Sequence, residues 1–455
     1  LMRSSAASDV YKRQLLCFAT KGAVSKIICI IFTIAIALGS CMGGYYISKT
    51  GNLLSNMTTV SSNAKTTVSV VVKKSSNLKK KNDLAGHSIG VLQNIGTVGS
   101  KKVLKDLSKS GIEMNQTPYE SMTDMLAAFY NGDVDSIIIN ESSRDQITDI
   151  EEYAEFDKNT RVVYQTSYEV ENTDKANAVS NITNTPFNVL ISGSDTRGGF
   201  DENGRSDVIM VATVNPKTST VLLTSVPRDF YVTTACDAAD GCMQGALDKI
   251  THTGIHGTNT TKRTVEQLLG IEINYTFKVG FDAVTELVDA VGGVDVTVAP
   301  GYAVDHFACM YNLSVHEGVN HLNGEQALAF ARERYAYTEG DRQRTKNQQL
   351  VLMGIVDKIT SPAIVQNYSS IMDAMSNTFS TTMSSSEISD LIKYQINNNP
   401  KWKMEQYMVD GTGDTLMCAE LGDAASVMVP DQSTVKMAKD KINAVLAGKS
   451  ADDVK

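Results

Sequence analysis

Three consecutive apolar runs decide the fold: NVLISGSDTRGG at 188–199, GRSDVIMVATVNP at 204–216 and TVLLTSVPRDFYV at 220–232. Each run ends in a turn signal and is rich in residues that favour strands, which predicts three short strands of one sheet. Asn215 and Pro216 mark a turn between the second strand and the third. If these two strands form a hairpin, the start of one lies beside the end of the other, so Asp207 and Arg228 become neighbours.

Charged side chains gather at this edge of the predicted sheet. Asp195 stands where the first strand stops, and Asp207 stands where the second begins. Arg228 and either Arg197 or Arg205 add guanidinium groups at the same edge. The sequence therefore predicts a cluster of carboxylates and arginines, which is either a working site or a network that only holds the strand ends.

Two further runs add polar residues with regular spacing. In EQALAFARERY at 325–335, Arg332 and Arg334 are two residues apart, and on an extended chain both would point to the same side. The segment GDRQRTKNQQLVLMGIVDKI at 340–359 predicts a helix. On that helix one face carries Asp341, Arg344 and Gln348.

Two carboxylates beside several arginines, without a histidine, indicate phosphate chemistry. Mg²⁺ prefers hard carboxylate oxygens and commonly bridges one or two carboxylates to phosphate oxygens. Guanidinium groups match phosphate oxygens in a bidentate fork and keep their charge. The cluster therefore suits a pyrophosphate with a bound metal ion, where catalysis is mostly positioning and charge neutralisation.

The composition describes a globular protein of several domains. The 455 residues are 42% hydrophobic and 20% charged with only 8 prolines, so we expect a sizeable core. The 42 Lys and Arg against 51 Asp and Glu give a formal charge of -9, which argues against sequence-independent binding to nucleic acid. We therefore expect no nucleic-acid partner, and any anion site must be a local cluster of basic residues.

The N-terminal region predicts a membrane anchor. Residues 1–14 are polar without a helical period and are interpreted as a translation or assembly artefact. The uncharged segment 27–47, within a signal-anchor at 22–48, is long enough to cross a bilayer as one helix. Basic residues precede it, which predicts a single-pass cell-membrane protein with a cytoplasmic N-terminus and an extracellular catalytic domain. Lipidation at Cys41 after cleavage is the alternative.

Four segments follow the anchor: a Ser/Thr/Lys-rich stalk at 49–83, an accessory α/β domain at 84–170, a catalytic domain at 187–360 and an extension that completes it at 361–455. The accessory segment alternates strand and helix patterns and resembles one lobe of an extracellular solute-binding protein. A single lobe lacks the partner face that would close on a ligand. The predicted fold class is α/β, in which the catalytic domain has a central mixed sheet flanked by helices.

Four cysteines lie beyond the anchor, and in an oxidising compartment they allow two disulfides. We expect one bridge between Cys236 and Cys242 and another between Cys309 and Cys418, with four free thiols as the alternative. None of them has the CxxC spacing that structural zinc favours.

Three basic residues lie between the two groups of motifs. His252 and His256 are four residues apart, but Gly254 stands between them and no glutamate is adjacent, which favours a loop with incidental imidazoles over a metal pair. Lys249 is a candidate cation at the edge of the site.

The runs that carry these residues resemble the successive signatures of the LytR-CpsA-Psr (LCP) family. They are GSDTRGG, RSDVIMVATVNPKT, SVPRDFYV, DKITHTGIHG, GGVDV, LNGEQALAFARERY and GDRQRTKNQQ, in order within 187–360. Members of that family are anchored, outward-facing proteins, mainly of Gram-positive bacteria. The resemblance implies a phosphotransferase that moves an undecaprenyl-pyrophosphate-linked teichoic acid, capsule or other wall polymer onto peptidoglycan muramic acid and releases undecaprenyl phosphate.

The resemblance also implies roles for individual residues. It assigns Mg²⁺ or Mn²⁺ to Asp195 and Asp207, the lipid pyrophosphate to Arg205, Arg228, Arg332 and Arg334, and catalysis to Asp341, Arg344 and Gln348. Asp341 would orient the arginines or act as a base. Residues 265–296 are candidates to line a tunnel for the prenyl chain. The last motif departs from the family at Asn347, where an arginine is common, so one cationic contact is missing or is replaced by Lys346.

Two other functions remain open at this point. One is a non-catalytic envelope protein that binds or senses a polyprenyl phosphate through the same cluster. The other is a lipid pyrophosphatase, in which water takes the place of the sugar hydroxyl. A transcriptional regulator is disfavoured by the outward topology and the net acidity.

Overall fold

The computed structural model describes residues 63–194, 202–237, 241–308, 310, 312–361, 370–371, 374 and 379–455. The predicted artefact at 1–14 and anchor at 22–48 lie outside these residues. Within the described part, no helix is both long enough and apolar enough to span a bilayer. The residues from Ser55 to Lys455 form one compact unit.

The accessory domain is a five-stranded sheet with the strand order β3-β2-β4-β1-β5. Its strands are β1 (Asn63–Lys73), β2 (Ser88–Leu92), β3 (Asn115–Tyr119), β4 (Ser136–Asn140) and β5 (Thr160–Glu171). Its helices are α3 (Thr97–Ser108), α4 (Met122–Asn131), α5 (Arg144–Asp149) and α6 (Phe156–Asn159), with short 3-10 turns η1 (Lys81–Leu84), η2 (Glu141–Ser143) and η3 (Glu151–Tyr153). The expected alternation of strands and helices is present, from β2 through α3, β3 and α4 to β4.

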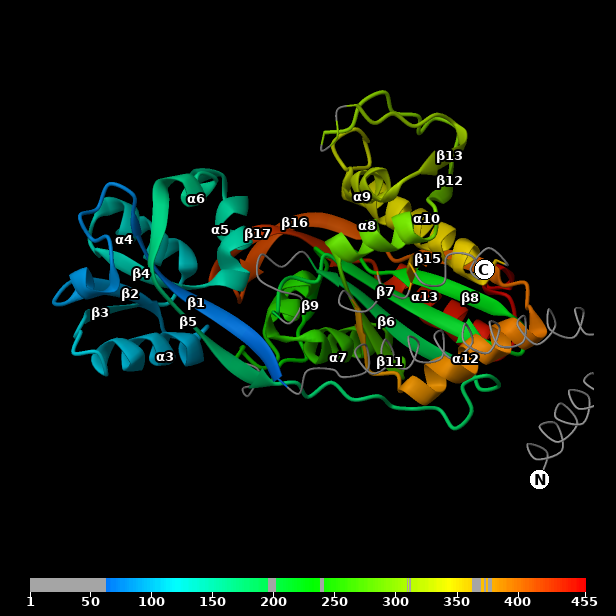
Figure 1. Ribbon diagram of the computed structural model, residues 1–455, viewed down its shortest axis with the longest axis horizontal. Helices are drawn as coiled ribbons and strands as arrows, with labels where there is room; N and C mark the ends of the chain where they lie inside the picture. Colours follow the sequence, from blue (N-terminus) through cyan, green and yellow to red (C-terminus); the bar gives the residue numbers. More distant parts are fainter. Residues whose placement is uncertain are drawn as a thin grey trace, which may run out of the picture. The chain divides into compact units, whose positions relative to one another are not determined.

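The predicted stalk is wrong for residues 63–73, which form β1 in the interior of this sheet. β1 pairs antiparallel with both β4 and β5. Val70 and Val72 pack on the face covered by α3, whereas Val71 packs on the face covered by α4 and α5 (Figure 1). The Ser, Thr and Lys content of the segment concealed a β-branched run whose residues alternate between two buried faces.

The second domain has a six-stranded mixed sheet with the order β14-β11-β6-β7-β8-β15. The strands are β6 (Phe187–Ser194), β7 (Val208–Asn215), β8 (Thr220–Ser225), β11 (Tyr275–Gly280), β14 (Phe379–Thr381) and β15 (Lys403–Met408). β7 runs antiparallel to its two neighbours β6 and β8, whereas β11 is parallel to β6 and β15 is parallel to β8. The predicted mixed sheet and the hairpin about Asn215 are therefore confirmed.

Helices cover both faces of this sheet. Ile209, Val211 and Leu222 face α7 (Thr258–Leu269) and α13 (Gln432–Leu446). Their neighbours in sequence, such as Met210 and Leu223, face the opposite way toward α10 (Asp341–Thr360). Because β15 and α13 come from the C-terminal extension, that extension is part of the sheet and its cover (Figure 1).

The remaining elements are β9 (Tyr231–Thr233), β10 (Leu247–Lys249), η5 (Ile250–His256), α8 (Phe281–Ala290), β12 (Val294–Val298), β13 (Gly318–Leu322), α9 (Gly324–Arg332), α12 (Ser385–Asn398), β16 (Gly411–Cys418), β17 (Asp423–Pro430) and η6 (Ala451–Asp453). Val265, Leu269 and Ile273, from the predicted tunnel lining, pack in the core between α7 and the sheet. This part of the predicted lining is therefore ordinary core.

The cysteines follow one of the two predicted bridges. Cys236 and Cys242 form a disulfide. Cys418 is a buried free thiol, so the predicted bridge from Cys309 to Cys418 is wrong; Cys309 itself lies outside the described residues. At the end of β16, Cys418 packs with Leu421 and Val427, and burial raises its pKa to about 12.

The accessory domain contacts the second domain directly. The backbone N–H of Met122 donates to the Leu421 carbonyl oxygen at 2.9 Å. The Thr123 hydroxyl donates to Asp423 Oδ2 at 2.6 Å. Both contacts fix the start of α4 against the turn between β16 and β17.

Candidate active site

The strand register brings Asp207 and Arg228 together, as predicted. The Asp207 N–H donates to the Gly193 carbonyl oxygen at 2.8 Å, which places Asp207 beside the end of β6. Arg228 follows β8, and its Nη1 donates to Asp207 Oδ1 at 2.7 Å. Asp195, predicted at the same edge, lies outside the described residues.

Both groups of this pair are charged. Burial alone would raise the pKa of Asp207, but the guanidinium groups of Arg228 and Arg205 outweigh it, so the pKa lies below its ordinary value. Burial opposes the charge of Arg228 as well, yet Asp207 and the nearby Asp229 and Asp341 raise its pKa. The edge of the sheet therefore presents an ionised carboxylate held by a buried cation.

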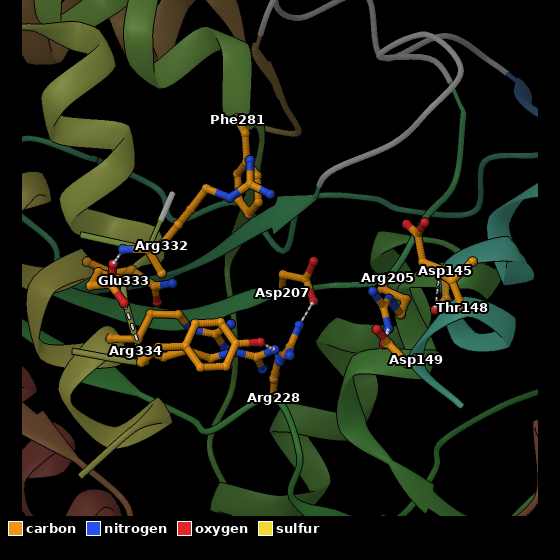
Figure 2. Close-up of a pocket in the computed structure, with 14 residues that line it drawn as sticks. Asp145, Thr148, Asp149, Arg205, Asp207, Arg228, Phe281, Arg332, Glu333 and Arg334 are labelled. Carbon is orange, nitrogen blue, oxygen red and sulfur yellow. Dashed lines mark hydrogen bonds and ion pairs between the residues drawn. The ribbon is translucent and has the colours of Figure 1, made fainter. Parts of the chain in front are cut away.

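A cavity of about 480 Å³ opens beside this pair and contains most of the predicted site (Figure 2). Five predicted arginines line it, namely Arg205, Arg228, Arg332, Arg334 and Arg344, together with Asp207 and Gln348. Asp341 lies behind the lining, where its Oδ1 is 2.6 Å from Arg344 Nη2 and 4.0 Å from Arg228 Nε. Asp341 thus forms ion pairs with two arginines of the cavity.

Arg332 and Arg334 reach the cavity from the end of a helix rather than from one extended run. Arg332 is the last residue of α9, and Glu333, which follows it, is extended with φ −67° and ψ 127°. The Arg332 guanidinium lies 5.3 Å from the centre of the Phe281 ring. Arg334 donates to the hydroxyl of Tyr335 at 2.6 Å. The predicted convergence is correct, although it is produced by the end of a helix.

Glu333 organises this turn and was missed in the sequence. Its side chain is only 1% exposed. Oε2 accepts from the Ala308 N–H at 2.6 Å, and Oε1 accepts from the N–H groups of Tyr335 at 2.7 Å and Ala336 at 3.1 Å. The signal available in the sequence was an acidic residue between two arginines.

Helix α10 supplies the floor of the cavity. It begins after Gly340, whose φ of +55° suits glycine. Arg344 is 8% exposed, and burial together with the charge of Arg228 lowers its pKa. Among the described residues, the Nε atoms of Arg344 and Arg228 have no hydrogen-bond acceptor. These donors suit an anion with several oxygens.

The departure at Asn347 has a structural explanation. Asn347 is fully buried; it accepts from Gln343 Nε2 at 2.9 Å and donates to the Phe330 carbonyl oxygen at 3.1 Å. Lys346 Nζ lies 5.8 Å from the centre of the Tyr302 ring, and Lys346 does not line the cavity. The predicted replacement of a cation by Lys346 is therefore wrong, because successive helical residues point in different directions.

The accessory domain contributes to the cavity, although the sequence predicted a catalytic domain confined to 187–360 and its C-terminal extension. Asp145, Thr148 and Asp149 line the cavity from α5. Arg205 Nη1 donates to Asp149 Oδ2 at 2.5 Å. This contact is invisible in the sequence because it joins two domains.

The remaining basic candidates have carboxylate partners outside the cavity lining. His252 Nδ1 lies 2.7 Å from Asp248 Oδ1, and His256 Nε2 lies 2.9 Å from Glu420 Oε2. Lys249 Nζ is 3.4 Å from an oxygen of Asp229. Among the residues that the structure describes, no group of three or more His, Cys, Asp or Glu forms a metal cluster.

Family models match both halves of the chain. The model described as "LytR_cpsA_psr family" matches residues 153–444. The model described as "NMT1/THI5 like" matches residues 56–184, which include the accessory sheet.

Similar proteins of known name include the "Polyisoprenyl-teichoic acid--peptidoglycan teichoic acid transferase TagU" of Enterococcus faecalis. It is 35% identical over 250 residues, which cover 54% of this chain and 77% of that protein. The protein of the same name from Bacillus subtilis is 31% identical over 229 residues, or 50% of this chain and 69% of that one. Among solved structures, protein gbs0355 from Streptococcus agalactiae is 27% identical with a TM-score of 0.51, covering 61% of this chain and 92% of that chain.

Proposed function

The chain belongs to the LytR-CpsA-Psr family, and on this premise we propose that it transfers a glycopolymer from undecaprenyl pyrophosphate to the muramic acid of peptidoglycan. The polymer is a teichoic acid, a capsular polysaccharide or another wall polymer. The names of the relatives give teichoic acid and peptidoglycan as what those proteins act on. The observation that carries the proposal is one cavity that gathers five arginines beside the ionised Asp207.

The reaction is a displacement at the phosphorus that carries the sugar. The acceptor hydroxyl oxygen forms a bond to this phosphorus, and the bond from the phosphorus to the bridging oxygen breaks. The bridging oxygen leaves as part of undecaprenyl phosphate, and the hydroxyl proton is released to solvent. Because negative charge is spread over the phosphate oxygens in the transition state, fixed cations stabilise it.

The arginines divide this work by position. Arg228 and Arg344 lie near each other and have unused Nε–H donors for phosphate oxygens. Arg332 and Arg334 reach the cavity from the end of α9 and supply further cations for the pyrophosphate. Asp341 keeps Arg344 in place through the contact of 2.6 Å. We assign Asp341 this orienting role rather than that of a base.

We assign Mg²⁺ or Mn²⁺ to Asp207 together with Asp195. Asp207 suits the ion because its lowered pKa keeps a hard carboxylate ionised beside the arginines. Asp195 follows Gly193, the partner of the Asp207 N–H, by two residues. When bound, the ion neutralises charge on the pyrophosphate. The protein is anchored in the cell membrane through 22–48 and faces outward, which brings its lipid substrate within reach.

The test is a transfer assay on the full chain in detergent with a lipid-pyrophosphate-linked sugar, peptidoglycan chains and Mg²⁺. We expect a phosphodiester-linked product that disappears with EDTA and in Asp207→Ala and Arg332→Ala. Arg342→Ala is the matched control, because Arg342 lies on α10 but pairs with Asp410 at 2.7 Å outside the cavity lining. Release of sugar phosphate without acceptor would indicate a pyrophosphatase, and lipid binding without either product would indicate a sensor.

A further inference from the structure

Helix α5 is a wall of the active-site cavity that lies outside residues 153–444, the part that matches the family model. Asp145, Thr148 and Asp149 line the cavity from this helix. Figure 2 shows them beside Arg205, on the side of the cavity across from the end of α9. The accessory domain therefore takes part in the cavity that binds the substrate.

Ion pairs of Arg144 fix the start of α5 within the accessory domain. Arg144, at its start, is 9% exposed and grips Glu141 with two hydrogen bonds of 2.6 Å and 2.8 Å. A third bond of 2.9 Å joins Arg144 to Asp157. Bidentate pairs of this kind fix geometry as well as charge. The residues of α5 that face the cavity therefore have a defined position.

Asp149 also fixes one of the cavity arginines. Arg205 donates to Asp149, and the carboxylate of Asp207 lies on its other side. The Arg205 guanidinium therefore interacts with one carboxylate from each domain, Asp149 from the accessory domain and Asp207 from the second domain.

The two walls of the cavity suit different chemical groups. Phosphate oxygens are attracted by the arginines and repelled by the carboxylates of α5. Carboxylate and hydroxyl oxygens instead accept hydrogen bonds from neutral hydroxyl groups. On the arginine side, Arg344 lines the cavity, is 8% exposed and has an Nε without a hydrogen-bond acceptor among the described residues. A ligand that joins a pyrophosphate to a sugar would fill both walls.

We propose that Asp145, Thr148 and Asp149 form a subsite for the sugar hydroxyls next to the pyrophosphate, and that Asp149 positions Arg205 between the sugar and the phosphate. The accessory domain thereby selects the carbohydrate. This inference rests on the proposed transfer reaction. The sugar belongs either to the lipid-linked donor or to the peptidoglycan acceptor, which share this chemistry.

The experiment measures binding to the full chain in detergent, so it does not depend on turnover. The donor probes are farnesyl pyrophosphate and farnesyl pyrophosphate bearing one N-acetylglucosamine, and the acceptor probe is soluble peptidoglycan chains. Two probes carry sugar, namely the N-acetylglucosamine-bearing farnesyl pyrophosphate and the peptidoglycan chains. We expect Thr148→Val and Asp145→Ala each to lower the affinity for one of these two probes about tenfold relative to the wild type, since each substitution removes a hydrogen bond. Farnesyl pyrophosphate binding should stay within a factor of two in these two variants, whereas Asp149→Asn, which also loosens Arg205, should weaken binding of both farnesyl probes.

Glu155→Gln is the matched control, because Glu155 is an exposed acid of the accessory domain that pairs with Lys158 away from the cavity. A loss confined to the sugar-bearing donor assigns the subsite to the donor, and a loss confined to peptidoglycan chains assigns it to the acceptor. Unchanged affinity for both sugar-bearing probes, or an equal loss for farnesyl pyrophosphate in Thr148→Val and Asp145→Ala, overturns the proposal. Absence of product in the transfer assay would refute the proposed function but leave this result intact.

Discussion

Replacing Glu333 with glutamine should loosen the turn that carries Arg332 and Arg334 without altering either arginine. The carboxylate of Glu333 accepts three backbone N–H groups while being 1% exposed. Glutamine has the same shape but only one acceptor oxygen. If that oxygen keeps the bonds from Tyr335 and Ala336, the new NH₂ group faces the N–H of Ala308.

The magnitude follows from this count of bonds. A hydrogen bond to a charged group contributes about 1.5–3 kcal/mol, so losing one such bond and weakening two others costs about 3 kcal/mol. Part of that cost appears as a lower free energy of unfolding. The rest appears in ligand binding, because pyrophosphate must then order a turn that is no longer preformed. We expect the affinity for inorganic pyrophosphate to fall at least tenfold.

Urea unfolding gives the stability, and isothermal titration with inorganic pyrophosphate gives the affinity. Glu325→Gln is the control, since Glu325 is an exposed acid on the first turn of the same helix. Equal midpoints and equal affinities for the two variants would show that the three N–H contacts of Glu333 do not hold the arginines. If Glu333→Gln binds pyrophosphate more weakly but keeps the urea midpoint of the wild type, the substitution alters only the order of the turn and not the stability of the fold.

Three further outcomes follow from contacts described above. Asp207→Asn should lower stability by about 3 kcal/mol at pH 7, because Arg228 then keeps only the more distant carboxylates of Asp229 at 3.9 Å and Asp341 at 4.0 Å. Because the pKa of Asp207 is below its ordinary 3.8, the difference should persist down to about pH 4 and shrink only below it, in urea unfolding against pH. With a pKa of about 12, Cys418 is ionised in about 1 of 10⁴ molecules at pH 8, so iodoacetamide should label it slowly until urea is added, followed by mass spectrometry. Arg144→Lys cannot keep two bonds to Glu141 and should lower the melting midpoint, at a cost of about 2 kcal/mol, whereas Lys158→Arg should not.

The sequence predicts those parts of the site that depend on neighbouring residues in the chain. The turn at Asn215 sets the register of β7 and β8, and that register alone places Asp207 beside Arg228. The helical spacing likewise predicted that Arg344 and Gln348 share a face, and both line the cavity. Local patterns succeed because strand pairing and helical periodicity fix directions over a few residues.

The sequence was insufficient where the contact depends on distant residues. Nothing near Asp149 indicates that its carboxylate reaches Arg205, which lies in another domain. The burial of Glu333 depends on how the segment around Ala308 packs against it. The Ser, Thr and Lys residues of β1 are typical of a stalk, and its valines predict a strand only when the buried faces on both sides are known. These failures share one cause, since the burial that decides each case comes from the tertiary structure.

The position of β15 beside β8 has a consequence for biosynthesis. β8 leaves the ribosome long before β15 and α13. Its edge therefore stays unpaired, and the sheet face at Ile209, Val211 and Leu222 has α7 but not α13 to cover it until translation is almost complete. A nascent chain that is released early, before Trp402, contains every arginine of the cavity and yet cannot close the sheet that positions them. Such fragments should be degraded, and completion of the C-terminal strand and helix would then limit how much folded protein accumulates.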